Sequence, residues 1–247
     1  MTTRAEFLGE IRREMAKTPG AFPATPALRP ARPAEVAETI RRELAERWPE
    51  TLERFRQEFE RVGGVFYRVG SIDAVPGVVG RIAREREARR LVAWHPSALG
   101  RDLVPPLRSE GLDGEAMPPG ALDDPRARQA LRERIAAADL GLTGVDLAIA
   151  ETGSLVLVSG AGRPRSTSLL PPYHVAVFDR TALVESLAQV GVLLEAWHAG
   201  EAPAGRGAAI NVITGPSRTA DIELTLTRGV HGPKEVHAIF VEAPWRG

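Results

Sequence analysis

From residue 65 onward the chain alternates short apolar runs with helix-type segments, and this rhythm restricts the fold more than any other feature. Strand-type runs occupy 65–69 and 91–95, and the segment between them, 72–90, has the pattern of a helix. Strands that alternate with helices favour a mostly parallel sheet covered on both faces. The sequence therefore predicts an α/β fold.

The second half of the chain continues the same alternation. Asp124 and Pro125 are typical of a helix N-cap and first turn, so we expect a helix from there to about residue 139. Residues 102–122, rich in Pro and Gly, are expected to form an irregular connection. The remaining expected elements are strands at 146–150, 155–159, 174–178, 210–214 and 236–242, a turn at 151–154 and a helix at 181–198.

The first 33 residues differ in character from the rest. Residues 4–17 have helical spacing, and the segment 19–33 contains five prolines, so it is expected to be an extended strap. Residues 34–62 are expected to form a helix interrupted at Pro49. We therefore predict an N-terminal helix and Pro-rich strap (1–33) followed by a single α/β domain (34–247). The helix is expected to reach a neighbouring subunit or partner.

Charge and cysteine content exclude several function classes. Lys+Arg and Asp+Glu both number 32, which disfavours nucleic-acid binding through bulk charge. No apolar run suits a membrane span and no apolar signal core is present, which predicts a cytoplasmic protein. The chain has no cysteine, no convincing metal-ligand spacing and no dinucleotide fingerprint. Redox chemistry would therefore need an organic cofactor or a partner chain.

A polar segment follows an apolar strand at residues 215–219. Gly215 permits close backbone approach or a positive φ, and Pro216 suits the first turn of a helix or a tight loop. The amides from Ser217 onward would then favour an anion, to which Arg218 and the hydroxyl of Thr219 add donors. The sequence thus predicts an anion-binding site here, although Ser217 could equally be a simple helix cap.

Three further residues are candidates for catalysis, and one more for anion binding. Asp221 could orient Arg218, act as a base or bind a substrate hydroxyl. Glu151 ends an apolar strand, where a carboxylate could have a raised pKa or act as a nucleophile. His231, in Gly-Val-His-Gly-Pro, could serve as acid, base or donor, and Arg165 lies in a polar loop that could close on an anion. The alternatives are a carbonyl-capping histidine and water-facing charges.

Four motifs together resemble the lactate utilization (LUD) domain family, in particular its small subunit type without cluster cysteines. The resemblance is clear over about residues 130–242, and upstream the order and length still fit. It implies a Rossmann-like α/β domain, similar to the NagB/RpiA/CoA transferase-like fold, with an N-terminal helical extension. The motifs are IAETGSLVLVSG (149–160), SLLPPYHVAV (168–177), GPSRTADIE (215–223) and GVHGP (229–233).

The resemblance also implies a function. Family members act in an iron–sulfur system that oxidises L-lactate to pyruvate, so iron–sulfur clusters are expected on partner subunits and no cofactor on this chain. This chain would contribute a pocket for a small anion, a carboxylate or phosphate. Two alternatives are a non-catalytic assembly or regulatory module, and an independent phosphosugar or acyl-CoA enzyme of the same fold.

Overall fold

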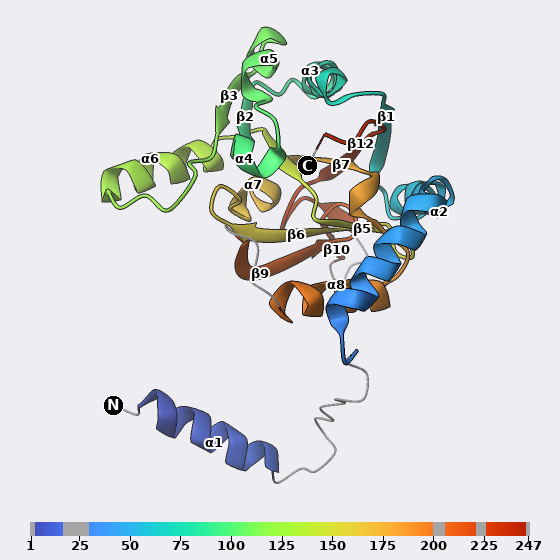
Figure 1. Ribbon diagram of the computed structural model, residues 1–247. Coiled ribbons are helices and arrows are strands. Elements are labelled where there is room, and N and C mark those ends of the chain that lie inside the picture. The colour runs from blue at the N-terminus through green and yellow to red at the C-terminus, as the bar shows by residue number, and fades with distance from the viewer. Residues whose placement is uncertain (1–2, 17–29, 200–205, 221–225, 246–247) are drawn as a thin grey trace.

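A six-stranded parallel sheet forms the centre of the computed structural model, which describes residues 3–16, 30–199, 206–220 and 226–245 (Figure 1). The strand order is β1-β12-β7-β4-β2-β3, and every neighbouring pair is parallel. The predicted α/β class with a mostly parallel sheet is confirmed, while the similarity to the NagB/RpiA/CoA transferase-like fold stays a prediction. The strands are β1 (Val65–Val69), β2 (Arg90–Ala93), β3 (Asp113–Ala116), β4 (Leu140–Gly144), β7 (Tyr173–Asp179) and β12 (Glu235–Val241).

A second sheet of four strands has the order β8-β5-β6-β9. Within it β5 and β8 are parallel, and the β5–β6 and β6–β9 pairs are antiparallel. A separate antiparallel pair, β10–β11, follows β9 in the chain. The strands are β5 (Leu147–Ile149), β6 (Ser154–Gly160), β8 (Leu183–Val184), β9 (Arg206–Ile213), β10 (Arg218–Ala220) and β11 (Leu226–Arg228).

Helices surround the two sheets, and none of those described is long and apolar enough to cross a membrane. The predicted start of α6 is confirmed, because the Asp124 carboxylate accepts the amides of Arg126 and Ala127 at 3.1 and 3.2 Å. The helices are α1 (Arg4–Ala16), α2 (Pro33–Arg61), α3 (Val75–Glu85), α4 (Pro96–Leu99), α5 (Val104–Ser109), α6 (Pro125–Ala136), α7 (Ser166–Leu169) and α8 (Leu187–Ala199), with 3₁₀ turns η2 (Ile72–Ala74) and η3 (Arg180–Ala182).

The long helix α2 packs on both sheets. Near its start, Ile40 and Leu44 join a buried cluster with α8 and the second sheet. Near its end, Phe55 and Phe59 belong to the main core, and the Phe55 ring meets Phe178 of β7 edge-on at 5.2 Å. The predicted interruption at Pro49 is wrong, since α2 continues through it. Packing at both ends of the helix offsets the one backbone hydrogen bond that proline removes.

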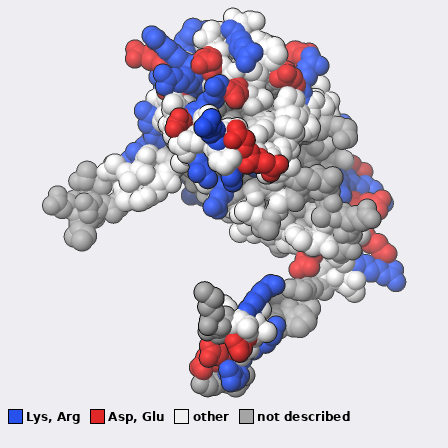
Figure 2. Space-filling view, turned by 90° about the vertical axis from the view of Figure 1, so that its left-hand side faces the viewer, with Lys and Arg blue, Asp and Glu red and all other residues white. Residues whose placement is uncertain are grey.

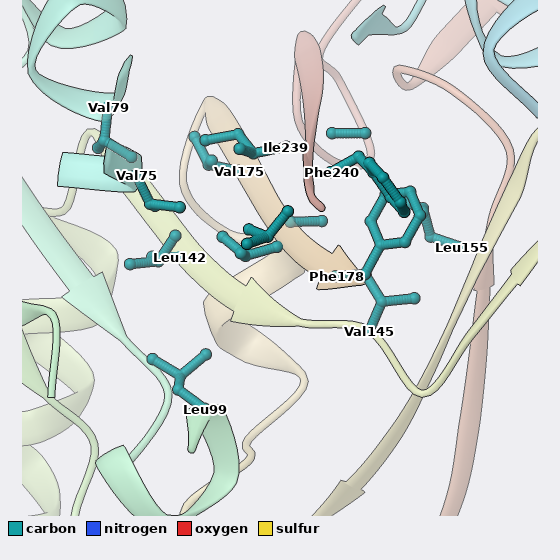
Figure 3. Close-up of a cluster of buried hydrophobic side chains, with 14 of the residues drawn as sticks. Val75, Val79, Leu99, Leu142, Val145, Leu155, Val175, Phe178, Ile239 and Phe240 are labelled. Carbon is teal, nitrogen blue, oxygen red and sulfur yellow. The ribbon is translucent and has the colours of Figure 1, made fainter. Parts of the chain in front are cut away.

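Alternate residues of the central strands pack against different layers, as the two-residue period of a strand requires. Val75 and Val79 of α3 approach Val175 and Ile239 on one face (Figure 3). Aromatic rings pack on the other face. The ring centres of Phe178 and Phe240 are 5.5 Å apart, and the ring of Trp48 of α2 stacks on Phe240 at 5.7 Å. Helix α2 and helix α3 therefore cover opposite faces.

The region expected to be an irregular connection, 102–122, contains the short helix α5 and the edge strand β3. The central strand β4 was also not predicted, because glycines at 141 and 144 weaken its strand pattern. The helix expected over 72–90 starts as the turn η2 and ends at Glu85. The one expected over 181–198 is preceded by η3 and β8.

The predicted division into an N-terminal helix with a Pro-rich strap (1–33) and a single α/β domain (34–247) stays a prediction. Helix α1 is present and is drawn apart from the two sheets in Figure 1, but most of the Pro-rich strap lies outside the described residues. Figure 2 shows basic and acidic side chains intermingled on the face in view, as expected for a chain with equal numbers of each.

Candidate functional site

The predicted anion site at 215–219 does not begin a helix. Gly215 has a φ of 76°, which turns the chain sharply, and residues from Arg218 form the strand β10. A Cβ at Gly215 would meet the Val62 carbonyl oxygen at 2.6 Å, so this turn lies directly against the end of α2. Of the two expected forms, the structure has a tight turn and not a helix, because the chain continues into β10, which pairs with the nearby β11.

Ser217 joins the two predicted polar segments. Its amide donates to the Pro233 carbonyl at 2.8 Å, and its carbonyl accepts the Gly229 amide at 3.0 Å. Its Oγ accepts the amide of His231 at 3.2 Å. The structure thus brings the backbone of the His231 loop against Ser217. The amide and carbonyl of Ser217 and its Oγ are engaged within the chain.

Arg218 contacts the end of α2. Its guanidinium donates to the Val62 carbonyl, one of the last carbonyls of the helix, and lies over Gly63. Thr219 is opposite Thr227 in the β10–β11 pair. Asp221 lies outside the described residues. Arg218 is therefore a helix-capping residue in this structure, and whether it also binds an anion stays a prediction.

Glu151 lies at the start of α8. Its Oε2 accepts the amide of Leu187 at 3.0 Å, which places a negative charge at a helix N-terminus. The same turn connects to the anion segment through hydroxyls, since Ser154 Oγ is 2.7 Å from Thr152 Oγ1 and 2.6 Å from Thr214 Oγ1. The turn 151–154 and the segment beginning at Gly215 are thus neighbours. Among the described residues, no hydrogen bond or ion pair joins Arg165 to them.

A cavity that the sequence did not predict lies at the carboxyl ends of the central strands. It has a volume of about 790 Å³, and residues that directly follow β4 or end β7 line it. Ligands of open α/β sheets usually bind beyond the carboxyl ends of the strands, where the strand order reverses. Here the chain leaves β2 toward β3 and leaves β4 toward β7, so the order reverses between β2 and β4. Charged and aromatic side chains in the cavity wall include Arg41, Asp146, Arg163, Asp179, Trp197 and Trp245.

A buried ion pair forms part of the cavity wall. Arg163 Nη2 lies 2.9 Å from Asp146 Oδ1, and these two side chains are 12% and 2% exposed. Asp146 Oδ2 accepts the Val158 amide at 2.7 Å, and the guanidinium lies 4.8 Å from the centre of the Trp94 ring. Arg163 Nε is buried and has no hydrogen-bond partner among the described residues. These contacts fix the orientation of the arginine.

Asp179 is a second buried carboxylate in the wall. It is 1% exposed, and its Oδ1 accepts the amide and the hydroxyl of Thr181 at 2.9 and 2.5 Å. Its Oδ2 is buried and has no hydrogen-bond partner within the described part of the chain. An aspartate that ends an apolar strand was the signal in the sequence that could have identified this residue.

The loop 160–166 is held firmly beside the cavity. Gly160 and Arg163 exchange backbone hydrogen bonds of 3.2 and 3.0 Å, and Trp94 Nε1 donates to the Pro164 carbonyl at 3.3 Å. Gly162 has a φ of 71°, and a Cβ there would lie 2.6 Å from His95 Cβ, which only glycine avoids. A smaller cavity of about 550 Å³ lies on the other side of this loop, toward α6.

Two histidines are buried in the central sheet. Burial lowers the pKa of His174 to about 3, with a smaller contribution from His237, and its Nε2 lies 2.8 Å from Thr143 Oγ1. Burial also lowers the pKa of His237, against the opposing effect of Glu235, whose Oε2 is 3.2 Å away. Within the described ranges, no group of three or more metal-ligating side chains could hold a metal ion.

Comparison with known proteins gives consistent matches. The LUD domain family matches residues 52–241. A lactate utilization protein C from Halalkalibacterium halodurans is 34% identical over 69% of this chain and 70% of its own length. One from Shouchella clausii is 34% identical over 63% of each. The crystal structure of a DUF162 family protein from Deinococcus radiodurans matches with a TM-score of 0.52 and 22% identity, over 78% of this chain and 97% of that one.

Proposed function

The chain belongs to the LUD domain family, and from this premise we propose that it is a protein C-like subunit of an iron–sulfur system that oxidises L-lactate to pyruvate. Relatives named lactate utilization protein C support a role in lactate utilization, and this observation carries the proposal. A cytoplasmic location is part of it.

The division of labour follows from the chemistry of the chain. Oxidation of lactate releases two electrons and two protons, and the electrons need an acceptor. The sequence has no cysteine to supply thiolate ligands, so the proposed clusters belong to partner subunits. This chain would bind an organic anion and present it to those partners.

The anion-binding residues proposed from the sequence are Gly215, Ser217, Arg218 and Thr219, together with Arg165. His231, Glu151 and Asp221 are the proposed catalytic residues. The hydrogen bond from the His231 amide to Ser217 Oγ supports a shared site, because it holds the two segments together. An anion on Arg218 would compete with the Val62 carbonyl for the guanidinium.

Complementation tests this proposal. A strain without this gene is expected to regain growth on lactate with the wild-type chain and lose it with Arg218→Ala, while growth on glucose is unaffected. Arg54→Ala is the matched control, since Arg54 is an exposed arginine of α2 outside the site. Full growth with Arg218→Ala would remove Arg218 from the site, and failure of the wild-type chain to restore growth would reject the lactate role.

An assembly or regulatory role is the second candidate, and one observation favours it. Phe7 and Ile11 of α1 are 56% and 39% exposed, and they are one helical turn apart. Such a stripe suits docking to another protein. Calorimetry with lactate, pyruvate, sugar phosphates and coenzyme A separates the candidates, because an assembly module need bind none of them. The third candidate, a phosphosugar or acyl-CoA enzyme, predicts binding of the last two.

A further inference from the structure

The cavity at the carboxyl ends of β4 and β7 is distinct from the site proposed above. None of the residues predicted from the sequence to bind or react lines it. Its volume of about 790 Å³ falls in the range of small-molecule sites, roughly 300–1,000 Å³. Its position at the reversal of strand order is the usual place for a ligand in this kind of sheet.

Asp179 gives the cavity an acceptor that lacks a donor. A buried carboxylate oxygen without a hydrogen bond is costly, so its place in a folded protein calls for an explanation. Oδ1 is fully used by Thr181, which fixes the carboxylate, whereas Oδ2 has no partner among the described residues. A hydroxyl or ammonium group is the chemistry that this oxygen would accept.

Two arginines give the same cavity donors for an anion. Arg163 is oriented by Asp146 and by the Trp94 ring, and its buried Nε lacks a partner within the described residues. Arg41 of α2 also lines the cavity and is exposed, with no ion pair to any other described residue. Because Asp146 already balances Arg163, Arg41 supplies the positive charge for a carboxylate.

We propose that this cavity binds a short carboxylic acid that bears a hydrogen-bond donor on the carbon next to the carboxylate. The carboxylate lies with Arg41 and Arg163, and the donor lies with Asp179. Trp197 and Trp245 also line the cavity and leave room for a longer side chain on the acid. The donor is a hydroxyl in a hydroxy acid or an ammonium in an amino acid, and the experiment below distinguishes them. The proposal rests on the cavity and not on lactate utilization.

Isothermal titration calorimetry on the full chain uses acids that differ only in the donor. L-Lactate, L-alanine and propionate share a three-carbon skeleton, and 3-phenyllactate, phenylalanine and 3-phenylpropionate form the longer set. In at least one set, a donor-bearing acid is expected to bind about tenfold or more tightly than the acid without a donor, as expected for a hydrogen bond to a charged group. Preference for the hydroxy acid or the amino acid identifies the donor.

Asp179→Asn tests the acceptor with the least disturbance, because the amide oxygen can still accept the Thr181 bonds at the Oδ1 position. It is expected to abolish the preference for the donor-bearing acid. Arg41→Ala is expected to weaken every acid about tenfold or more, with Arg54→Ala as its unaffected control. Because Arg41 is exposed, Arg41→Ala is expected to fold, so it tests the cavity even if Asp179→Asn does not fold.

Three results would overturn the proposal. They are no binding of any probe at millimolar concentration, equal affinity for acids with and without the donor, and wild-type affinities in both Asp179→Asn and Arg41→Ala. Binding that is lost in Arg218→Ala but kept in Arg41→Ala would instead place the ligand at the Gly215–Thr219 segment. Failure of the wild-type chain to restore growth on lactate, with the acids binding as expected, would count against the proposed function alone.

Discussion

Two sets of ionisable side chains with little exposure differ in their place in the fold. Asp146 and Asp179 lie at the carboxyl ends of β4 and β7, Arg163 lies in the loop after β6, and all three line a cavity. His174 and His237 lie within the sheet, on β7 and β12, where each has a polar neighbour. The first group is placed for binding, and the second affects how stability depends on pH.

His174 makes stability depend on pH below neutrality. Burial lowers its folded-state pKa to about 3, below an unfolded value of about 6.5, so the unfolded state binds the proton more readily. The contribution of neutral His174 to stability is therefore fully present above about pH 6.5, and it is lost as the pH falls toward the folded-state pKa. We expect the free energy of unfolding, measured with urea between pH 7 and 5, to decrease by up to about 1.4 kcal/mol per pH unit for this residue.

A neutral side chain in the same place removes this dependence. His174→Gln is expected to show a smaller slope than the wild type over the same range of pH. Thr143→Val is the control, because it removes the hydrogen-bond partner of His174 and keeps the imidazole, so the slope remains. Equal slopes in wild type and His174→Gln would contradict the assignment.

At the scale of elements, the turn between β5 and β6 is fixed by its contact with α2. Gly153 has a φ of 61°, and a Cβ there would overlap the backbone nitrogen of Phe59. The added Cβ would meet backbone atoms of the helix, which cannot shift without disturbing its hydrogen bonds. The same turn holds Glu151 at the start of α8, which connects this contact to a candidate site residue.

Gly153→Ala is expected to destabilise the protein by about 2 kcal/mol or more, through backbone strain at positive φ and overlap with α2. Gly77→Ala is the matched control, since Gly77 is in the helix α3 with open space where its Cβ would be. That control should stabilise the protein by about 0.5–1 kcal/mol. Thermal unfolding monitored by circular dichroism measures both, and a decrease of similar size in both variants would argue against the contact with α2.

Elements with a strong local pattern could be predicted from the sequence, and those decided by distant contacts could not. The β7 and β12 strands and the cap at Asp124 follow from local rules, and all are present. Strand β4 escaped notice because Gly141 breaks its pattern. This glycine is required because the Thr167 carbonyl occupies the place of its side chain. That contact comes from a helix far along the chain.

The candidate sites show the same limit at the scale of the whole molecule. Ser217 and the loop at His231 are close in the sequence, and a hydrogen bond joins them in the structure. The cavity could not be predicted, because Asp146, Arg163 and Asp179 are far apart in the sequence. The strand order β7-β4-β2 contributes to placing them in one cavity wall. Contacts between residues close in the sequence can be predicted from the sequence, whereas a cavity at the carboxyl ends of strands depends on the order of the strands in the sheet.

The N-terminal helix contributes little to the packing of the rest of the molecule. Over residues 4–14, whose side chains the structure describes, none belongs to the buried clusters of the core, and the apolar residues Phe7 and Ile11 are exposed. Exposed apolar side chains at helical spacing suit a partner surface. If the proposed iron–sulfur partners bind this helix, the chain would have separate parts for assembly and for ligand binding.

Deletion of residues 2–29 is therefore expected to leave the thermal midpoint and the affinity for the acids unchanged, and to abolish co-purification with the proposed iron–sulfur partners. The double variant Phe7→Ser, Ile11→Ser should reproduce the loss of the partners in the full chain, because it removes the apolar stripe alone. Arg13→Ser, a polar change on the same helix, is the control and should retain them. Scanning calorimetry measures the midpoint, titration calorimetry measures the affinity, and affinity co-purification from the native host measures partner binding. A midpoint lowered by several degrees would show that the segment packs on the domain, and unchanged co-purification would place the partner surface elsewhere.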